Sequence, residues 1–288
     1  MTTQRKILKN HGLRPRRRLG QSFLEDGNIT NRIVEIADIR SEDTVVEIGA
    51  GLGMMTKLLA ARAQRVFALE IDPNLVALLQ EEEALKDFTN VDIILTDVLK
   101  YDFSLVSQQC SSDTLKVIGN IPYNISSQIL FHLIYYRHYI ACMILMFQKE
   151  MADRIIAPAG TKDYGVPSVI LSMYSIVFHE MTIPPHCFYP RPKVLSSVLR
   201  IVMRDKPLVD LKNDDFFFNI VKIAFSKRRK TLLNNLRSAN LPLCEKDIIL
   251  SLEAAGIDGR RRGETLTTEE FGTLSNVFFS KITGDYLS

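Results

Sequence analysis

Apolar and polar positions change in regular blocks over the first two thirds of the chain, and these blocks predict strands that alternate with helices. Short apolar runs predict strands at 44–48, 66–70, 91–95, 115–118 and 140–147, of which the one at 115–118 has the pattern of a buried strand. Helical periodicity covers 28–37, 54–62, 126–136 and 149–156, and Pro73 is placed to open a further helix. Apolar runs at 169–182 and 195–203 predict one more helix and two more strands. This alternation indicates a parallel sheet with helices on both faces.

The pattern changes after Arg204. Residues 205–207 have the composition of a linker, and from Asp214 onward only helical periodicity remains. We therefore predict a basic segment over residues 1–27, an α/β domain over 28–206 and a small helical domain over 207–288.

The composition excludes several classes of protein. With 288 residues, 46% of them hydrophobic and 24% charged, the chain is ordinary for a globular protein with a large core. No apolar run approaches the roughly 20 residues that span a bilayer, and the N-terminus lacks the apolar stretch of a secretory signal. The 4 cysteines are scattered and the 5 histidines show no metal-ligand spacing. We expect a cytoplasmic monomer with reduced thiols, without a metal and without a membrane partner.

Basic residues are clustered, although the net charge is only +3. The first 18 residues hold seven Arg and Lys and no acid, residues 216–243 also lack an acid, and 260–262 are all Arg. One such cluster could be a solvated surface or a flexible tail, but three favour a polyanionic partner such as nucleic acid. We expect RNA contacts from Arg16, Arg17, Arg18, Lys227, Arg228, Arg229 and Lys230. An Arg-rich N-terminus also resembles an organelle transit peptide, but this one is poor in Ser.

A Gly-rich turn, Gly49-Ala50-Gly51-Leu52-Gly53, follows the first predicted strand and lets a ligand approach the backbone closely. Glu70 ends the next strand about 20 residues later, the spacing at which an acid binds ribose hydroxyls. Asp97 follows the third strand, where it could accept a hydrogen bond from an adenine amine. The ligand could be NAD or S-adenosylmethionine, and a packing turn without a ligand is a third alternative. We favour S-adenosylmethionine, because the Gly spacing departs from the dinucleotide fingerprint and because Glu47 can favour a cationic ligand.

The tetrapeptide Asn120-Ile121-Pro122-Tyr123 follows the strand at 115–118, which we expect Gly119 and Pro122 to end. The Asn120 amide oxygen and the Ile121 carbonyl could accept hydrogen bonds from an aromatic amine while Tyr123 stacks on its ring. These two acceptors would stabilise the positive charge that develops on the amine nitrogen, so no strong base is required. The alternative is a Pro-containing loop with a core Tyr. We expect Ser126 to cap the following helix.

Six motifs together resemble the ribosomal RNA adenine N6-dimethyltransferase family, and most of all its bacterial small-subunit members. These motifs are Leu19-Gly20-Gln21-Ser22-Phe23-Leu24, Val46-Glu47-Ile48-Gly49, Asn120-Ile121-Pro122-Tyr123-Asn124-Ile125-Ser126, Leu145-Met146-Phe147-Gln148-Lys149-Glu150, Phe188-Tyr189-Pro190-Arg191-Pro192-Lys193-Val194 and Ala224-Phe225-Ser226-Lys227-Arg228-Arg229-Lys230-Thr231. The resemblance implies a Rossmann-like class I methyltransferase domain and a small C-terminal α-helical domain.

The resemblance also implies a reaction and its residues. It implies S-adenosylmethionine contacts at Ser22, Leu24, Gly49, Glu70, Asp97 and Asn120. The target adenine would be flipped out and held between Tyr123 and Phe188. Two adjacent adenines near the 3′ end of small-subunit (16S) rRNA would be dimethylated within the pre-30S particle, during subunit maturation. Two residues depart from the family pattern: Ser22 replaces a usual Asn and Arg191 a usual Pro.

Other members and other classes remain as alternatives. The macrolide-resistance enzymes, which act on large-subunit RNA, generally lack the basic block at 225–231. Mitochondrial transcription-factor relatives use the same fold as a binding module. A ribosome-assembly factor with secondary catalysis and an NAD oxidoreductase are the alternatives from other classes.

Overall fold

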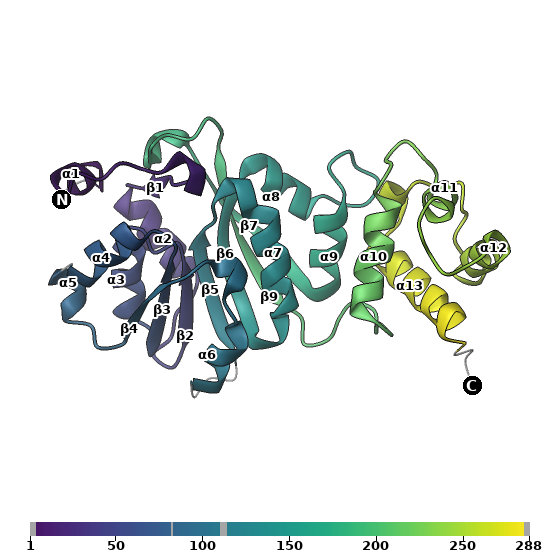
Figure 1. Ribbon diagram of the computed structural model, residues 1–288, viewed down its shortest axis with the longest axis horizontal. Coiled ribbons are helices and arrows are strands. Elements are labelled where there is room, and N and C mark those ends of the chain that lie inside the picture. The colour runs from purple at the N-terminus through teal and green to yellow at the C-terminus, as the bar shows by residue number, and fades with distance from the viewer. Residues whose placement is uncertain (1–3, 82, 110–113, 285–288) are drawn as a thin grey trace. The chain divides into compact units, whose positions relative to one another are not determined.

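The computed structural model describes residues 4–81, 83–109 and 114–284, and the chain forms two compact units. The first consists of Met1–Ala152 and Val177–Met203, and the second of Asp153–Ile176 and Arg204–Ser288. Figure 1 labels the elements of both units along the chain.

The first unit is built on a seven-stranded sheet of order β4-β3-β2-β5-β6-β9-β7. Its strands are β2 Thr44–Ile48, β3 Arg65–Glu70, β4 Val91–Leu95, β5 Leu115–Asn120, β6 Ile140–Gln148, β7 Ser175–Ile183 and β9 Ser196–Met203. The pairs among β4, β3, β2, β5 and β6 are parallel, which confirms the α/β fold expected from the pattern. One strand differs from the expected parallel sheet, because β9 pairs antiparallel with β6.

Helices cover the sheet of this unit (Figure 1). The helices of this unit are α1 Gln4–Asn10, α2 Gly27–Ile36, α3 Met54–Ala60, α4 Pro73–Glu81, α5 Glu83–Lys86, α6 Phe103–Gln109 and α7 Ser126–Tyr135, with 3₁₀ turns at Arg17–Leu19, Val98–Lys100, Tyr123–Ile125, Arg137–Tyr139 and Pro185–Cys187. Helix α8 Lys149–Ile156 begins in this unit and ends among the residues of the second. Residues Ile33 of α2 and Leu59 of α3 share a core cluster with Val45 of β2 and Ile118 of β5, so these two helices cover one face. The connections through α6 and α7 lead in the opposite direction along the sheet, and right-handed crossovers place them on the other face.

A second, two-stranded sheet joins segments that are far apart in the sequence. Strand β1 Phe23–Leu24 pairs antiparallel with β8 Phe188–Tyr189, so that Leu24 lies opposite Phe188. The N-terminal segment is thereby attached beside the carboxyl ends of the main strands.

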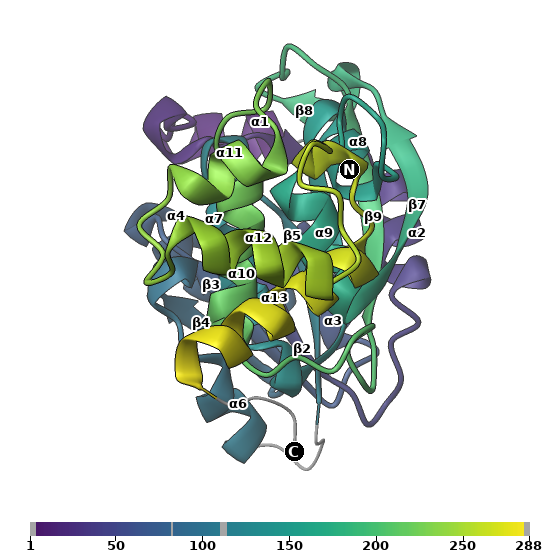
Figure 2. The same ribbon diagram turned by 90° about the vertical axis from the view of Figure 1, so that its right-hand side faces the viewer.

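The second unit is helical, as the pattern after Arg204 predicted. It contains α9 Val166–Tyr174, α10 Asp214–Ala224, α11 Leu232–Arg237, α12 Glu245–Ala254, the 3₁₀ turn Gly263–Thr265 and α13 Thr268–Thr283. Figure 2 labels α10, α11, α12 and α13 in a second view. Helix α9 packs on α10 and α13, and the Tyr174 hydroxyl donates to Asp214 Oδ1 at 2.7 Å. Residues 153–176 therefore group with the C-terminal helices, whereas the sequence pattern placed them in the domain 28–206.

Two local expectations need correction. Strand β5 does not end before Gly119 but continues to Asn120, because Gly119 pairs in register with Ile48 and any Cβ there would lie 2.9 Å from that side chain. Ser126 is the first residue of α7 and not its cap, since Ile125 holds the cap position and the Ser126 hydroxyl donates to the Tyr123 carbonyl. No helix within the described residues is both long enough and apolar enough to cross a membrane.

Candidate active site

The carboxyl ends of β2, β3, β4 and β5 border one open cavity, at the sheet edge where ligands bind in α/β folds. Its free space is about 1030 Å³, a volume that includes open solvent at its mouth. Eight residues predicted for the cofactor or the target base line it: Ser22, Gly49, Glu70, Asp97, Asn120, Ile121, Pro122 and Tyr123.

The Gly-rich turn and Glu70 form one hydrogen-bonded unit. Gly49 and Gly51 have φ of 76° and 59°, a region that L side chains rarely adopt, and the turn can take this shape because both are glycine. Glu70 Oε2 accepts from the Gly51 N–H at 3.0 Å, and its Oε1 accepts from the N–H groups of Ile71 and Asp72. Burial raises the pKa of Glu70, while these backbone donors oppose the rise. The carboxylate is therefore held in a fixed position at the cavity, suited to hydroxyl donors such as those of a ribose.

Asp97 lies one strand farther along the same edge. Its Oδ1 accepts from the Leu99 N–H at 3.0 Å, which fixes the side chain at the start of a 3₁₀ turn. The carboxylate lines the cavity beside Thr96 and Val98. A polar acceptor bordered by an apolar side chain is suited to an adenine, which offers an amine at the edge of an apolar ring.

Asn120 is oriented by the N-terminal segment. Its Nδ2 donates to the Ser22 carbonyl at 2.7 Å, and this bond directs Oδ1 away from that carbonyl. The Ser22 hydroxyl in turn donates to the Pro190 carbonyl at 2.9 Å. The contact that holds Asn120 uses a main-chain atom of residue 22, so the departure of Ser22 from the family pattern leaves it intact.

Tyr123 is held by a residue that the sequence did not single out. Its hydroxyl forms a hydrogen bond with the Ser196 hydroxyl at the buried start of β9. Burial raises the pKa of Tyr123, so the ring stays a neutral phenol at physiological pH. With one end anchored, the ring presents a fixed surface for stacking at the cavity.

Phe188 does not line this cavity. Its side chain is 1% exposed and belongs to a core cluster with Leu24 and Ile33. Pairing of β8 with β1 accounts for this burial. The base-stacking role that the resemblance implies for Phe188 would require the side chain to leave this cluster.

Leu24 and Glu47 line a smaller adjoining cavity, which shares Gly49, Gly51 and Asn120 with the main one. The Glu47 Oε2 accepts from the Thr56 hydroxyl at 2.6 Å. Burial raises the pKa of Glu47 to about 8, with a smaller contribution from the charge of Glu70. The protein thus keeps a buried acid directly behind the Gly-rich turn.

The basic residues of the N-terminal segment differ in their environment. The Arg16 guanidinium lies 3.1 Å from Asp72 Oδ1, whose side chain is only 4% exposed, and Gln21 Nε2 donates to the other Asp72 oxygen. Arg16 therefore fastens the segment to the start of α4, while a third of its side chain stays exposed. Arg18 is exposed and lines the main cavity. The side chain of Arg17 lies outside what the structure describes.

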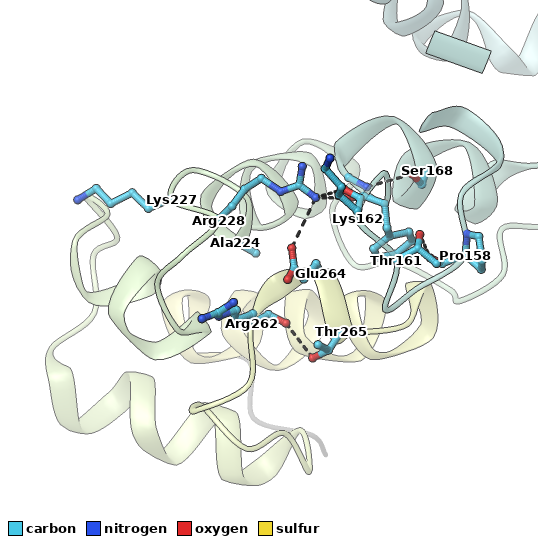
Figure 3. A network of polar contacts seen from close by, with 12 residues as sticks. Pro158, Thr161, Lys162, Ser168, Ala224, Lys227, Arg228, Arg262, Glu264 and Thr265 are labelled. Atoms are coloured by element: carbon cyan, nitrogen blue, oxygen red, sulfur yellow. Dashed lines mark hydrogen bonds and ion pairs between the residues drawn. The ribbon is translucent and has the colours of Figure 1, made fainter. Parts of the chain in front are cut away.

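The second basic cluster, Lys227 to Lys230, contains one residue that joins two distant segments, and we call its contacts the Arg228 clamp (Figure 3). Its Nη2 donates to the carbonyls of Lys162 and Tyr164 and lies 3.5 Å from Glu264 Oε2. The Gly160 N–H donates to the Glu264 carbonyl at 2.7 Å, which closes the same loop from its other end. Arg228 therefore holds the 158–165 loop although its side chain is half exposed. Lys227, Arg229 and Lys230 are exposed as well.

The arrangement of fold and cavity defines the class of protein. A Gly-rich turn, Glu70 and Asp97 on successive parallel strands fit an adenosyl group, and Asn120 with Tyr123 fits an aromatic amine beside it. No group of three or more His, Cys, Asp or Glu side chains able to hold a metal occurs in the described parts of the chain. The site is that of an S-adenosylmethionine-dependent methyltransferase.

Comparison with known proteins gives the family. The family model of ribosomal RNA adenine dimethylase matches residues 12–278. The chain belongs to this family, whose members are methyltransferases that use S-adenosylmethionine.

Relatives and solved structures agree with this membership. Ribosomal RNA small subunit methyltransferase A of Syntrophus aciditrophicus (strain SB) is 46% identical over 277 residues, which cover 96% of this chain and 98% of that protein. Its counterpart from Moorella thermoacetica (strain ATCC 39073 / JCM 9320) is 44% identical over 275 residues, with 93% and 94% covered. A crystal structure of a dimethyladenosine transferase from Plasmodium falciparum has a TM-score of 0.77 at 26% identity, covering 91% of this chain and 98% of that one. The 23S rRNA methyltransferase ErmE has a TM-score of 0.65 at 25% identity, with 89% and 99% covered.

Proposed function

We propose that this protein dimethylates N6 of two adjacent adenines near the 3′ end of small-subunit rRNA, using S-adenosylmethionine, during maturation of the subunit. Asn120 and Tyr123 line the same cavity as Glu70 and Asp97, and this arrangement is the main support for the proposal. A methyl donor and an aromatic amine can therefore meet in a single site.

The donor would lie along the carboxyl edge of the sheet. Asp97 would accept from its adenine amine, Glu70 would bind its ribose hydroxyls, and the Gly49 turn would pass close beneath it. S-adenosylmethionine supplies an electrophilic methyl group when bound, so the protein mainly has to align donor and acceptor. Ser22 and Leu24 would contribute through the N-terminal segment that closes the cavity.

The adenine would be bound by the tetrapeptide at the end of β5. Asn120 Oδ1 and the Ile121 carbonyl would accept the two N6 hydrogens, Pro122 would fix the turn, and Tyr123 would stack on the ring. As N6 takes up the methyl group, positive charge develops on the nitrogen, and these two acceptors stabilise it. Phe188 would complete the base site only after leaving its core cluster.

Sequence identity to the named relatives favours small-subunit RNA over large-subunit RNA as the substrate. The two small-subunit enzymes named above are 46% and 44% identical to this chain, whereas the 23S enzyme is 25% identical. We further propose that the protein acts on the pre-30S particle as a cytoplasmic monomer. The helical region over residues 207–288, with the N-terminal basic segment, would contact the RNA backbone.

Methylation of defined ribosomal substrates tests this function. Incubation with labelled S-adenosylmethionine and under-methylated small subunits should yield N6,N6-dimethyladenosine at two adjacent positions. Naked large-subunit RNA and mature, fully methylated small subunits serve as controls and should remain unlabelled. Product on large-subunit RNA alone would assign the protein to the resistance class of enzymes.

The exposed members of the second basic cluster should bind RNA phosphates. Replacing Arg229 and Lys230 together by alanine is expected to weaken binding to small-subunit RNA. A plot of the logarithm of the RNA association constant against the logarithm of salt concentration has a negative slope. Its magnitude should decrease by about 0.7 to 0.9 for each phosphate that the variant no longer neutralises. Binding measured over a series of salt concentrations gives both the affinity and the slope.

A charge-matched variant controls for the overall removal of two cations. Lys86→Ala with Lys206→Ala removes two exposed lysines outside the segments proposed to contact RNA and should leave the salt slope unchanged. Equal slopes for the two double variants would argue against phosphate binding by Arg229 and Lys230.

A further inference from the structure

Gln4 occupies a buried position that no motif of the sequence indicates. It is the first residue of α1, its side chain lines the smaller cavity with Leu24 and Glu47, and it is only 6% exposed. A buried amide normally satisfies both its donor and its acceptor, because an unpaired polar atom away from water is costly.

The hydrogen bond that Gln4 Nε2 donates determines the orientation of the side-chain amide. Nε2 donates to the Leu24 carbonyl at 2.7 Å and lies 3.6 Å from Met54 Sδ, and both of these partners are acceptors. Exchanging the amide oxygen and nitrogen would place two acceptors against each other, so the orientation is determined. Oε1 is consequently the free end of the group. It is buried and has no hydrogen-bond partner among the described residues.

The smaller cavity lies where the proposed cofactor would extend beyond the main cavity. An adenosyl group that runs from Asp97 past Glu70 reaches Gly49 and Gly51, which line both cavities. The remaining part of S-adenosylmethionine is an amino acid end with an α-ammonium group. Beyond the turn this end would meet Glu47 and the Gln4 amide, which line the smaller cavity and can accept hydrogen bonds from a cation.

We propose that Gln4 is a cofactor-binding residue whose Oε1 accepts a hydrogen bond from the α-ammonium group of S-adenosylmethionine. The inference rests on the cofactor placement proposed above. Helix α1 thereby becomes part of the cofactor site, since Leu8 at its next turn packs with Phe23 and Leu75 and holds it in place. The bond from Gln4 to the Leu24 carbonyl gives Leu24 its role at this site through a main-chain atom.

The test uses calorimetry on the full chain to measure its affinity for ligands that have or lack the amino acid end of the cofactor. Gln4→Met removes both amide bonds but keeps the length and burial of the side chain. We expect it to weaken binding of S-adenosylmethionine and S-adenosylhomocysteine by about 10- to 100-fold, the value of one charge-assisted hydrogen bond. Binding of 5′-methylthioadenosine, which lacks the amino acid, should be unchanged. Decarboxylated S-adenosylmethionine, which keeps the ammonium group, should lose affinity like the full cofactor.

Some outcomes would refute the role of Gln4 alone, and one would refute the proposed cofactor site. Equal weakening for methylthioadenosine would mean that Gln4 only supports the fold, and an undiminished affinity for the decarboxylated cofactor would assign Gln4 to the carboxylate. Normal binding of S-adenosylmethionine to Gln4→Met would also refute it, whereas failure of the unaltered protein to bind S-adenosylmethionine would refute the cofactor placement itself. Gln80→Met, at an exposed position of α4, is the matched control and should bind all four ligands normally.

Discussion

Replacing Asn120 by alanine is expected to lower kcat for adenine methylation by about 100- to 1000-fold, the usual cost of removing one group that stabilises transition-state charge. The substitution deletes the acceptor that the Ser22 carbonyl orients toward the cavity. Binding of the RNA should be nearly unaffected, because the basic surfaces lie elsewhere in the sequence. Single-turnover methylation and a separate RNA-binding measurement distinguish the two effects.

Asn31→Ala provides the control for this substitution. Asn31 is an exposed residue of α2 whose amide bonds only to the Gly27 carbonyl of its own helix. Methylation by that variant should match the unaltered enzyme. If Asn120→Ala retained more than about a tenth of the rate, the charge-stabilising role of Asn120 would be untenable.

Glu47→Gln is expected to remove a large pH dependence of stability. The pKa of Glu47 rises to about 8 in the folded protein from 4.5 in the unfolded chain, so between these values the folded state holds a proton that the unfolded state has lost. The free energy of unfolding therefore falls as pH rises through this window, by at most about 1.4 kcal/mol per pH unit. Glutamine keeps the acceptor for the Thr56 hydroxyl and cannot titrate, so the variant should gain stability over the unaltered protein from pH 5 to pH 8.

Urea unfolding of the cofactor-free protein at several pH values measures this difference. Glu253→Gln makes the same chemical change at an exposed position of α12 and should leave the pH slope as it is. A parallel slope for Glu47→Gln and the unaltered protein would show that Glu47 is ionised in the folded state at neutral pH.

The sequence predicted those parts of the fold that depend on local pattern. The β-branched runs at 44–48 and 91–95 coincide with β2 and β4. Strand β2 is buried along its whole length, where mainly apolar residues are needed, whereas β4 lies at the edge of the sheet and is only partly buried. The antiparallel direction of β9 could not be predicted, since nothing in its own residues distinguishes the two directions of pairing. Seven of the eight predicted residues at the cavity were predictable from the sheet, because parallel strands bring their carboxyl ends to one edge. Ser22 lies on the N-terminal segment and was expected from the family resemblance alone.

Charge pattern alone could not assign the basic residues. Arg16 and Arg228 stand in runs of similar composition to their neighbours, yet Asp72 pairs with the first and the carbonyls of a distant loop with the second. Ser196 and Gln4 were missed for a related reason. The side chain of each contacts residues far away in the chain, and a single polar residue carries no periodic signal.

The Arg228 clamp has a consequence for how this protein can change through evolution. Two of its three partners are main-chain carbonyls, those of Lys162 and Tyr164, and a carbonyl is the same whatever side chain the residue carries. The exposed positions 161–163 can therefore accept substitutions while the path of the backbone is conserved. Variation at these positions would alter the chemistry of the surface without altering its shape, whereas residue 228 itself has little freedom to vary.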